Sequence, residues 1–172
     1  MEFDEIIKKR FSCRSFENKE IEMEKIESVL EAVNTAPSAG NLQAYHVFVI
    51  TNGEKKKEVA EAAFNQKQIL EAPVVLVFFA DPERSAQKYK GFGENRYSLQ
   101  DATIAATFAW LKIIDLGLDA GWIGGFEENK LIRILAGNKK LIPAVVMPVG
   151  YCKSSQPSRK REEIERRKTI LE

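Results

Sequence analysis

Two arginines and a serine near the start of the chain have the spacing of an anion-binding site. Arg10, Ser12 and Arg14 occupy alternate positions, so an extended backbone would place all three on one side. Guanidinium groups form bidentate, charge-assisted hydrogen bonds with phosphate, and the hydroxyl adds a further donor. The competing interpretation is a set of solvated surface arginines. A second basic run, residues 158–161, either closes the same site or is an ordinary charged surface.

Two glycine-containing segments would let a ligand approach the backbone. Residues 37–43 (PSAGNLQ) combine small side chains with Asn41, whose amide offers both a donor and an acceptor to a heterocycle. Residues 122–126 (WIGGF) contain adjacent glycines between large apolar residues, so their N–H groups could face a ring nitrogen. The alternatives are a helix-to-strand turn for the first segment and a β-bulge or tight bend for the second.

Most familiar catalytic arrangements are missing. The chain has one histidine, His46, which is too few for a histidine-based metal site, and the sequence predicts that it is a structural strand residue. Neither a GxSxG nucleophile elbow nor a GxxxxGK[ST] phosphate loop is present. No metal is therefore expected, and either the protein is not an enzyme or a cofactor supplies the reactive atoms.

The hydrophobic pattern indicates an α+β fold, one sheet with helices on its faces. Helices are expected over residues 2–10, 22–35, 54–64, 98–116 and 127–135, and strands over 45–51, 74–80 and 141–151. We expect 74–80 to be buried on both faces, 81–96 to be an irregular surface segment, 119–124 to be a short strand or loop, and 162–171 to be helical. Pro143 and Pro148 should confine the last strand to an edge or to bulges.

The helix at 98–116 is apolar around nearly its whole circumference, so it must be buried on most sides. It is either a central helix of the monomer or a helix covered by a partner subunit. With 172 residues, the chain is expected to form a single domain, 1–172. Its net charge of +1 argues against a nucleic-acid partner, and no apolar run has the length of a membrane span.

The start of the chain lacks the layout of a signal peptide, which favours a cytoplasmic protein. Cys13 and Cys152 are the two cysteines. One long-range disulfide between them is an alternative, but free thiols are expected in a cytoplasmic chain.

The ordered set of motifs resembles the nitroreductase family of FMN flavoproteins from Glu5 to about Ile164. The resemblance rests on Arg-x-Ser-x-Arg at 10–14, Ala-Pro-Ser and Asn-x-Gln within 36–43, Glu-Ala-Pro at 71–73, Gln-Asp-Ala at 100–102, Gly-Leu at 117–118, WIGGF at 122–126, and Arg-Lys-Arg at 159–161. It implies a nitroreductase-like fold, with a central, mostly antiparallel sheet flanked by helices in an interlocked homodimer. The C-terminal extension, residues 153–172, would contact the partner subunit.

The resemblance also implies roles for particular residues. Arg10, Ser12, Arg159 and Arg161 would hold the FMN phosphate, and Arg14 would stabilise the negative charge of the reduced flavin. Asn65 and Gln68 would contact the pyrimidine edge. The remaining flavin contacts would be Ile123, Gly124 and Gly125 along the ring and, from the other subunit, Pro37, Ser38, Ala39 and Asn41.

The chemistry implied is a ping-pong hydride transfer at flavin N5, with no catalytic side-chain acid or base. NADH or NADPH would donate, and a nitroaromatic, a quinone or a similar flat molecule would accept. Dehalogenation, flavin destruction and dehydrogenation on the same fold are alternatives, as is a non-catalytic flavin-binding dimer. The chain is short for the family, so the site is expected to be open or roofed only by residues 81–96. Ala39 stands where serine is common, and Glu162 where a proline-rich continuation is common.

Overall fold

A four-stranded antiparallel sheet lies at the centre of the computed structural model, which describes residues 1–154 and 160–171. In spatial order its strands are β1 (Tyr45–Ile50), β2 (Val74–Ala80), β4 (Ile142–Gly150) and the two-residue β3 (Asp119–Ala120). The expected α+β class, the mostly antiparallel sheet and the three longer strands are confirmed.

Strand β2 is the centre of the core because both of its faces are covered. All seven of its residues are buried, as its unbroken apolar run predicts. Side chains of alternate residues point to opposite faces. Leu76 and Phe78 pack into one hydrophobic cluster, whereas Val77 and Phe79 pack into the other.

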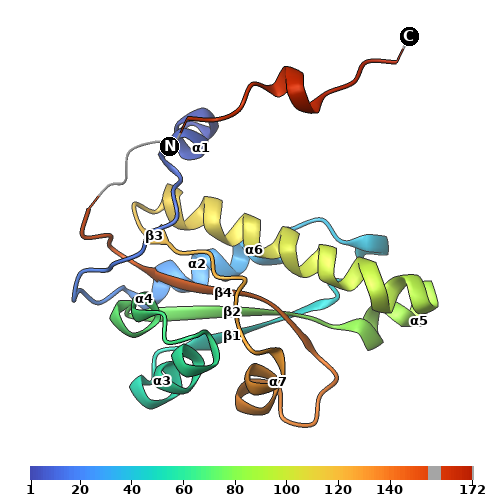
Figure 1. The fold of residues 1–172 in the computed structure, drawn as a ribbon, viewed down its shortest axis with the longest axis horizontal. Coiled ribbons are helices and arrows are strands. Elements are labelled where there is room, and N and C mark those ends of the chain that lie inside the picture. The colour runs from blue at the N-terminus through green and yellow to red at the C-terminus, as the bar shows by residue number, and fades with distance from the viewer. Residues whose placement is uncertain (155–159, 172) are drawn as a thin grey trace.

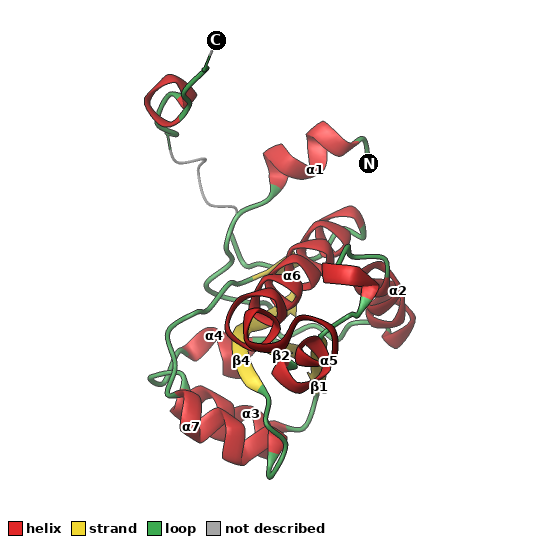
Figure 2. Ribbon diagram, turned by 90° about the vertical axis from the view of Figure 1, so that its right-hand side faces the viewer, coloured by secondary structure: helices red, strands yellow, loops and turns green. Residues whose placement is uncertain are grey.

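The helices form a layer on each face of this sheet (Figure 1). On one face lie α2 (Met23–Asn34) and α6 (Ser98–Asp115), and on the other lie α3 (Gly53–Ala62), α4 (Lys67–Glu71) and α7 (Glu128–Leu131), which continues as a π-helix, Ile132–Ala136. The view in Figure 2 shows the same three layers end on. The five helices expected between residues 2 and 135 are present, counting α1 (Phe3–Lys9), and Gly117 ends α6 at φ 74°. No helix of the described residues is long and apolar enough to cross a bilayer.

The expectation for the prolines of β4 is only partly met. Strand β4 is not an edge strand, because β2 flanks it on one side and β3 on the other. Pro143 does coincide with the register shift between Phe78 and Phe79, where the ladder is irregular. Pro148 lies in the regular ladder opposite Val75, and its carbonyl accepts the Gly121 N–H at 2.9 Å on the other side.

The prediction of an irregular segment at 81–96 was wrong. Helix α5 (Pro82–Phe92) and a following π-helix, Gly93–Tyr97, run directly into α6. Asp81 caps α5 by accepting the Arg84 N–H at 3.0 Å, and a proline at the first helical position suits a helix start. The irregular segment was predicted from the polar composition and the glycines, and the cap was not considered. The expected C-terminal helix at 162–171 is also reduced, to a 3₁₀ turn at Ile164–Arg167.

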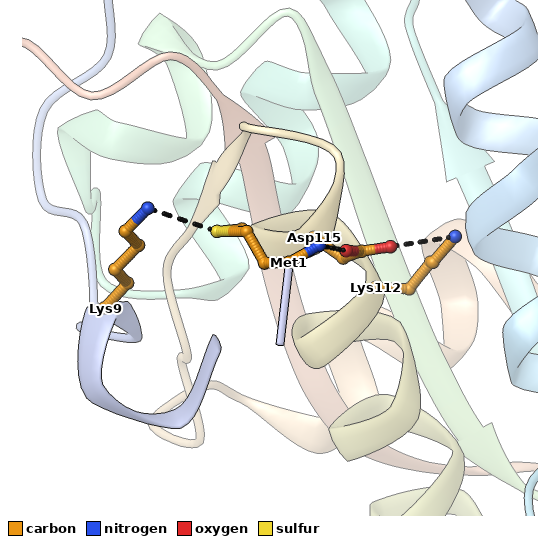
Figure 3. A network of polar contacts seen from close by, with 4 residues as sticks. All are labelled: Met1, Lys9, Lys112 and Asp115. Atoms are coloured by element: carbon orange, nitrogen blue, oxygen red, sulfur yellow. Dashed lines mark hydrogen bonds and ion pairs between the residues drawn. The ribbon is translucent and has the colours of Figure 1, made fainter. Parts of the chain in front are cut away.

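Helix α1 and the C-terminal segment, residues 160–171, both extend away from the sheet layers in Figures 1 and 2. One polar network ties the start of the chain to the end of α6 (Figure 3). The Met1 amino group contacts the Asp115 carboxylate at 2.8 Å, and Lys112 contacts the other oxygen at 3.1 Å. Lys9 donates to the Met1 sulfur at 3.2 Å. The Met1 amino group and Lys112 lower the pKa of Asp115.

Cys13 and Cys152 form a disulfide, which corrects the expectation of free thiols. The fold brings the two residues together, because an isolated bridge pairs Phe16 with Cys152 and the Cys13 N–H bonds to the Ala120 carbonyl at 3.0 Å. Cys13 is 1% exposed and packs with Phe16 and Ala72. The pairing depends on which distant segments the fold brings together, and the cellular compartment does not determine that.

Candidate functional site

The segment that carries Arg10, Ser12 and Arg14 lies beside β3 and the loop that follows it. Ser12 forms a parallel bridge with Ala120, and its hydroxyl oxygen accepts the Trp122 N–H at 3.1 Å. The hydroxyl hydrogen of Ser12 is then available to an anion. Cys13 is buried and Arg14 is exposed, whereas Arg10 and Ser12 are both half-buried.

Arg10 packs on the Trp110 ring, and among the described residues it forms no ion pair with a carboxylate. Its guanidinium lies 4.5 Å from the centre of the Trp110 ring, and Trp110 stacks on Trp122 with 5.4 Å between ring centres. Burial lowers the pKa of Arg10, and the nearby charge of Arg161 lowers it further. Within the described ranges no ion pair neutralises Arg10, Arg14 or Arg161, so two cations from opposite ends of the chain approach each other without an anion.

The segments expected along the flavin ring are neighbours. Ile123 is buried and exchanges both backbone hydrogen bonds with Val146, each at 3.0 Å, whereas Gly124 and Gly125 are exposed. Phe64 is the nearest side chain to Gly125: a Cβ built on that glycine would lie 3.9 Å from the Phe64 ring. Ile123, which these two hydrogen bonds fix in place, therefore directly precedes two exposed glycines.

The turn after α3 completes this group. Phe64 and Asn65 both have φ of 57°, a left-handed conformation that is uncommon for residues other than glycine. The Glu127 N–H bonds to the Ala62 carbonyl at 2.8 Å, which fastens the turn to the glycine segment. Gln68 lies on α4, where its side chain donates to Gln66 at 2.7 Å.

The loop at Pro37–Asn41 is built elsewhere in the same chain. The Ala39 N–H bonds to Asp101 at the start of α6, whereas Arg10 packs on Trp110, nine residues further along that helix. Nine residues span about 13 Å of α-helix. The structure therefore gathers the segments 10–14, 64–68 and 122–125, but it separates the 37–41 loop from them within one chain.

The two tail arginines differ in whether the structure describes them. Arg159 lies outside the described residues, while Arg161 lies within them. Trp110, on the long helix α6, was not among the residues expected at the site. The sequence arguments also gave no role to Asp101, which the Gln-Asp-Ala motif contains; an acidic residue at a helix start next to an apolar stripe was the available signal.

Glu71 braces the strand after the Arg-x-Ser-x-Arg segment. One of its oxygens accepts the Phe16 N–H at 2.9 Å and also contacts Lys153 at 3.2 Å. These contacts lower the pKa of Glu71, the backbone hydrogen bond contributing most.

A pH prediction follows from this depressed pKa. The unfolded chain binds a proton on Glu71 more readily than the folded protein, so the stabilisation is present above the ordinary pKa of 4.5 and is lost as the pH falls below it. In Glu71→Gln the free energy of unfolding should decline less steeply below that pH. Urea titrations across the acid range measure this slope, and equal slopes in the two proteins would contradict the prediction.

Comparisons with known proteins show which family the chain is similar to. A model of the nitroreductase family matches residues 7–83 and 63–151. A Methanothermobacter thermautotrophicus protein, provisionally named NADH dehydrogenase/NAD(P)H nitroreductase, is 30% identical over 155 residues, covering 88% of this chain and 78% of that protein. An FMN reductase [NAD(P)H] of Bacillus subtilis is 29% identical over 153 residues, which are 81% of this chain and 61% of that protein.

Solved structures show the same likeness. NfrA1 nitroreductase from B. subtilis superimposes with a TM-score of 0.85 at 25% identity, covering 95% of this chain and 72% of that one. A nitroreductase family protein from Clostridium novyi gives a TM-score of 0.80 at 30% identity, with 90% and 87% covered. The fold, the order of the motifs and the family match over most of the chain lead to one conclusion: this chain belongs to the nitroreductase family.

Proposed function

We propose that this chain is an FMN-dependent oxidoreductase that passes a hydride from NADH or NADPH to a nitroaromatic, a quinone or a similar flat organic acceptor. Family membership supports the oxidoreductase class, and the name FMN reductase [NAD(P)H] of the B. subtilis relative supports the cofactor and the donor. The observation that carries the proposal for this chain is the pair Arg10 and Arg161, whose charges lie near each other and which form no ion pair with a residue that the structure describes.

The residues present fit a flavin phosphate. A buried or half-buried cation normally has a partner, because desolvating a charge without compensation costs free energy. Arg10 is half-buried against Trp110, and the nearby charge of Arg161, which lowers the pKa of Arg10, has the same sign. A dianionic phosphate would relieve this repulsion, and the Ser12 hydroxyl would donate to it. Arg159 is proposed as a further contact on sequence grounds only.

The ring would lie along the open peptides of Gly124 and Gly125. Both glycines are exposed, and a Cβ built at Gly124 would meet nothing within 4 Å, so the space there is open to a ligand. Ile123 would pack beside the ring, Asn65 and Gln68 would contact its polar edge, and the Arg14 guanidinium would stabilise negative charge on it. When bound, FMN supplies the atom that accepts and donates hydride. The protein binds and orients, and no side chain is assigned as acid or base.

We further propose a homodimer in which the 37–41 loop of one subunit completes the site of the other. The separation of this loop from Arg10 within one chain supports a contribution in trans. Large apolar side chains on both projecting segments are exposed, as expected of surfaces that a partner covers: Phe3, Ile7, Ile164, Ile170 and Leu171. Light scattering should give twice the mass of the chain, and a monomer mass at every concentration would exclude a shared site.

The phosphate contact can be tested with Arg10→Ala. Loss of one charge-assisted bond should weaken FMN binding by about 2 kcal/mol, roughly 30-fold in the dissociation constant. Quenching of flavin fluorescence measures that constant. Arg133→Ala, which removes an exposed arginine on the π-helix after α7, is the matched control and should bind FMN as wild type does. If Arg10→Ala binds FMN as tightly as the control, Arg10 does not belong to the site.

The proposal as a whole is tested by an absorption spectrum of the purified protein, followed by NADH addition under argon. Flavin bands that bleach on addition are expected. A protein that stays colourless after incubation with FMN would contradict both the cofactor assignment and the enzymatic function.

A further inference from the structure

Asp101 is a buried carboxylate at the start of α6 for which the proposed chemistry has no direct use. Its side chain is 2% exposed. One oxygen accepts the Ala39 N–H at 2.9 Å. Burial raises the pKa of Asp101, and the N–H groups of Ala39 and Ala44 oppose this by favouring the charged form. The other oxygen, Oδ2, is buried and has no hydrogen-bond partner among the described residues. Such a group is costly to bury, so its position calls for a physical reason.

The loop that Asp101 holds is in an unfavourable backbone conformation. Gly40, Asn41 and Gln43 have positive φ values of 58°, 57° and 44°, and two of these residues carry a Cβ. Conformations of this kind persist only where the surroundings fix them. Within the loop the Ser38 hydroxyl accepts the Gln43 N–H at 3.0 Å. The Ala39 N–H bond to Asp101 is the fastening to a rigid element, the first turn of an 18-residue helix.

The held loop forms one wall of a hollow of about 670 Å³. Its lining includes Pro37, Ser38 and Ala39 from the loop, with Tyr97, Asp101 and Ile104 from the other side. Asp101 therefore borders the same hollow as Pro37–Ala39, and its bond to the Ala39 N–H fixes that wall through the backbone.

We propose that Asp101 is a positioning residue, which acts through the Ala39 N–H to hold the Pro37–Asn41 loop in the conformation that contacts the flavin of the partner subunit. The inference rests on the proposed function of that loop. It requires the acceptor oxygen of Asp101 but not its full negative charge, because a single oxygen makes the bond to Ala39. Asparagine should therefore replace it much better than alanine does.

The test compares Asp101→Ala, Asp101→Asn and a control, Asn52→Ala, in the full-length protein. Asn52 likewise accepts one backbone N–H, that of Lys55 at 2.9 Å, but at the start of α3. We expect Asp101→Ala to raise the FMN dissociation constant about tenfold and to change the visible circular dichroism of bound flavin. Asp101→Asn should remain within about threefold of wild type, and Asn52→Ala should match wild type in both measurements.

A backbone variant covers the case in which Asp101→Ala does not fold. Ala39→Pro removes the N–H itself, and Ser38 before it is already extended at φ −142° and ψ 155°, which a following proline favours. It should reproduce the loss of FMN affinity and the altered dichroism.

The outcomes separate the inference from its foundation. If wild type does not bind FMN, the proposed function itself fails. If wild type binds FMN and either Asp101→Ala or Ala39→Pro matches it in affinity and dichroism, Asp101 does not position the loop. A deficit of equal size in Asn52→Ala would equally overturn the inference, because the effect would then follow general stability.

A mixed-dimer experiment adds an independent readout. Subunits with Arg10→Ala and subunits with Asp101→Ala, exchanged at random, would form heterodimers in which one of the two sites has both residues intact. FMN binding at wild-type affinity should return to about a quarter of all sites, because half of the dimers are mixed. No recovery would mean that Asp101 serves its own subunit's flavin, contrary to the inference.

Discussion

Replacing Cys13 and Cys152 together with serine should lower the free energy of unfolding by about 4 kcal/mol. The disulfide joins residues separated by 139 positions. Cross-linking a loop of this length restricts the unfolded chain strongly, and the chain-entropy model gives about 5 kcal/mol for it. The observed loss should be somewhat smaller, because the unfolded chain stays partly compact and retains some of the contacts near Cys13.

Urea denaturation at fixed protein concentration and saturating FMN measures this loss, because ligand and partner binding both shift apparent stability. Wild type treated with a dithiol reductant should resemble the double variant. The double variant should not respond to the reductant, so it serves as the control for the reductant treatment. A reductant effect of less than about 1 kcal/mol on wild type would show that this cross-link does not limit the unfolded chain.

Phe78→Ala should destabilise the fold by about 4 kcal/mol. Phe78 is fully buried in β2 and packs in the cluster between the sheet and helices α2 and α6. Truncation removes a large apolar side chain and leaves a cavity that the surrounding strands cannot close, so the transfer term and the cavity term add. The same denaturation experiment measures the loss.

Phe92→Ala is the matched control, since Phe92 loses the same atoms but is 66% exposed at the end of α5. It should change stability by less than about 1 kcal/mol. Comparable losses in the two variants would mean that the sheet face can collapse around the cavity, or that Phe92 is covered by a second subunit. Light scattering of Phe92→Ala distinguishes these two explanations.

The elements that could be predicted are those with strong local signals. The unbroken apolar run of β2, the stripe of α2 and the long α6 ending at Gly117 each agree with the structure. The helix at 82–92 was missed because most of its residues are polar and Gly91 lies within it, and only the Asp81-Pro82 cap marked its start. The prolines of β4 were misjudged because the partner on one side, β3, is only two residues long.

In the candidate site, too, residues with a local signal could be predicted, and residues whose contacts lie far away in the sequence could not. Arg10, Ser12 and the paired glycines could be proposed because their residue types indicate a ligand. Trp110 and Asp101 act through contacts with residues far away in the sequence, Arg10 and Ala39, which no local pattern contains. The disulfide likewise depends on which strand ends the fold brings together, and arguments from cellular compartment do not address that.

The disulfide also decides how the molecule bears mechanical load. It closes residues 13–152 into a covalent ring, from which helix α1 and the C-terminal segment leave at neighbouring points. Tension applied between the two ends of the chain therefore passes through the sulfur–sulfur bond and bypasses the sheet. While the ring is closed, pulling on the two projecting segments can displace those segments, but it cannot unzip β2 from β4.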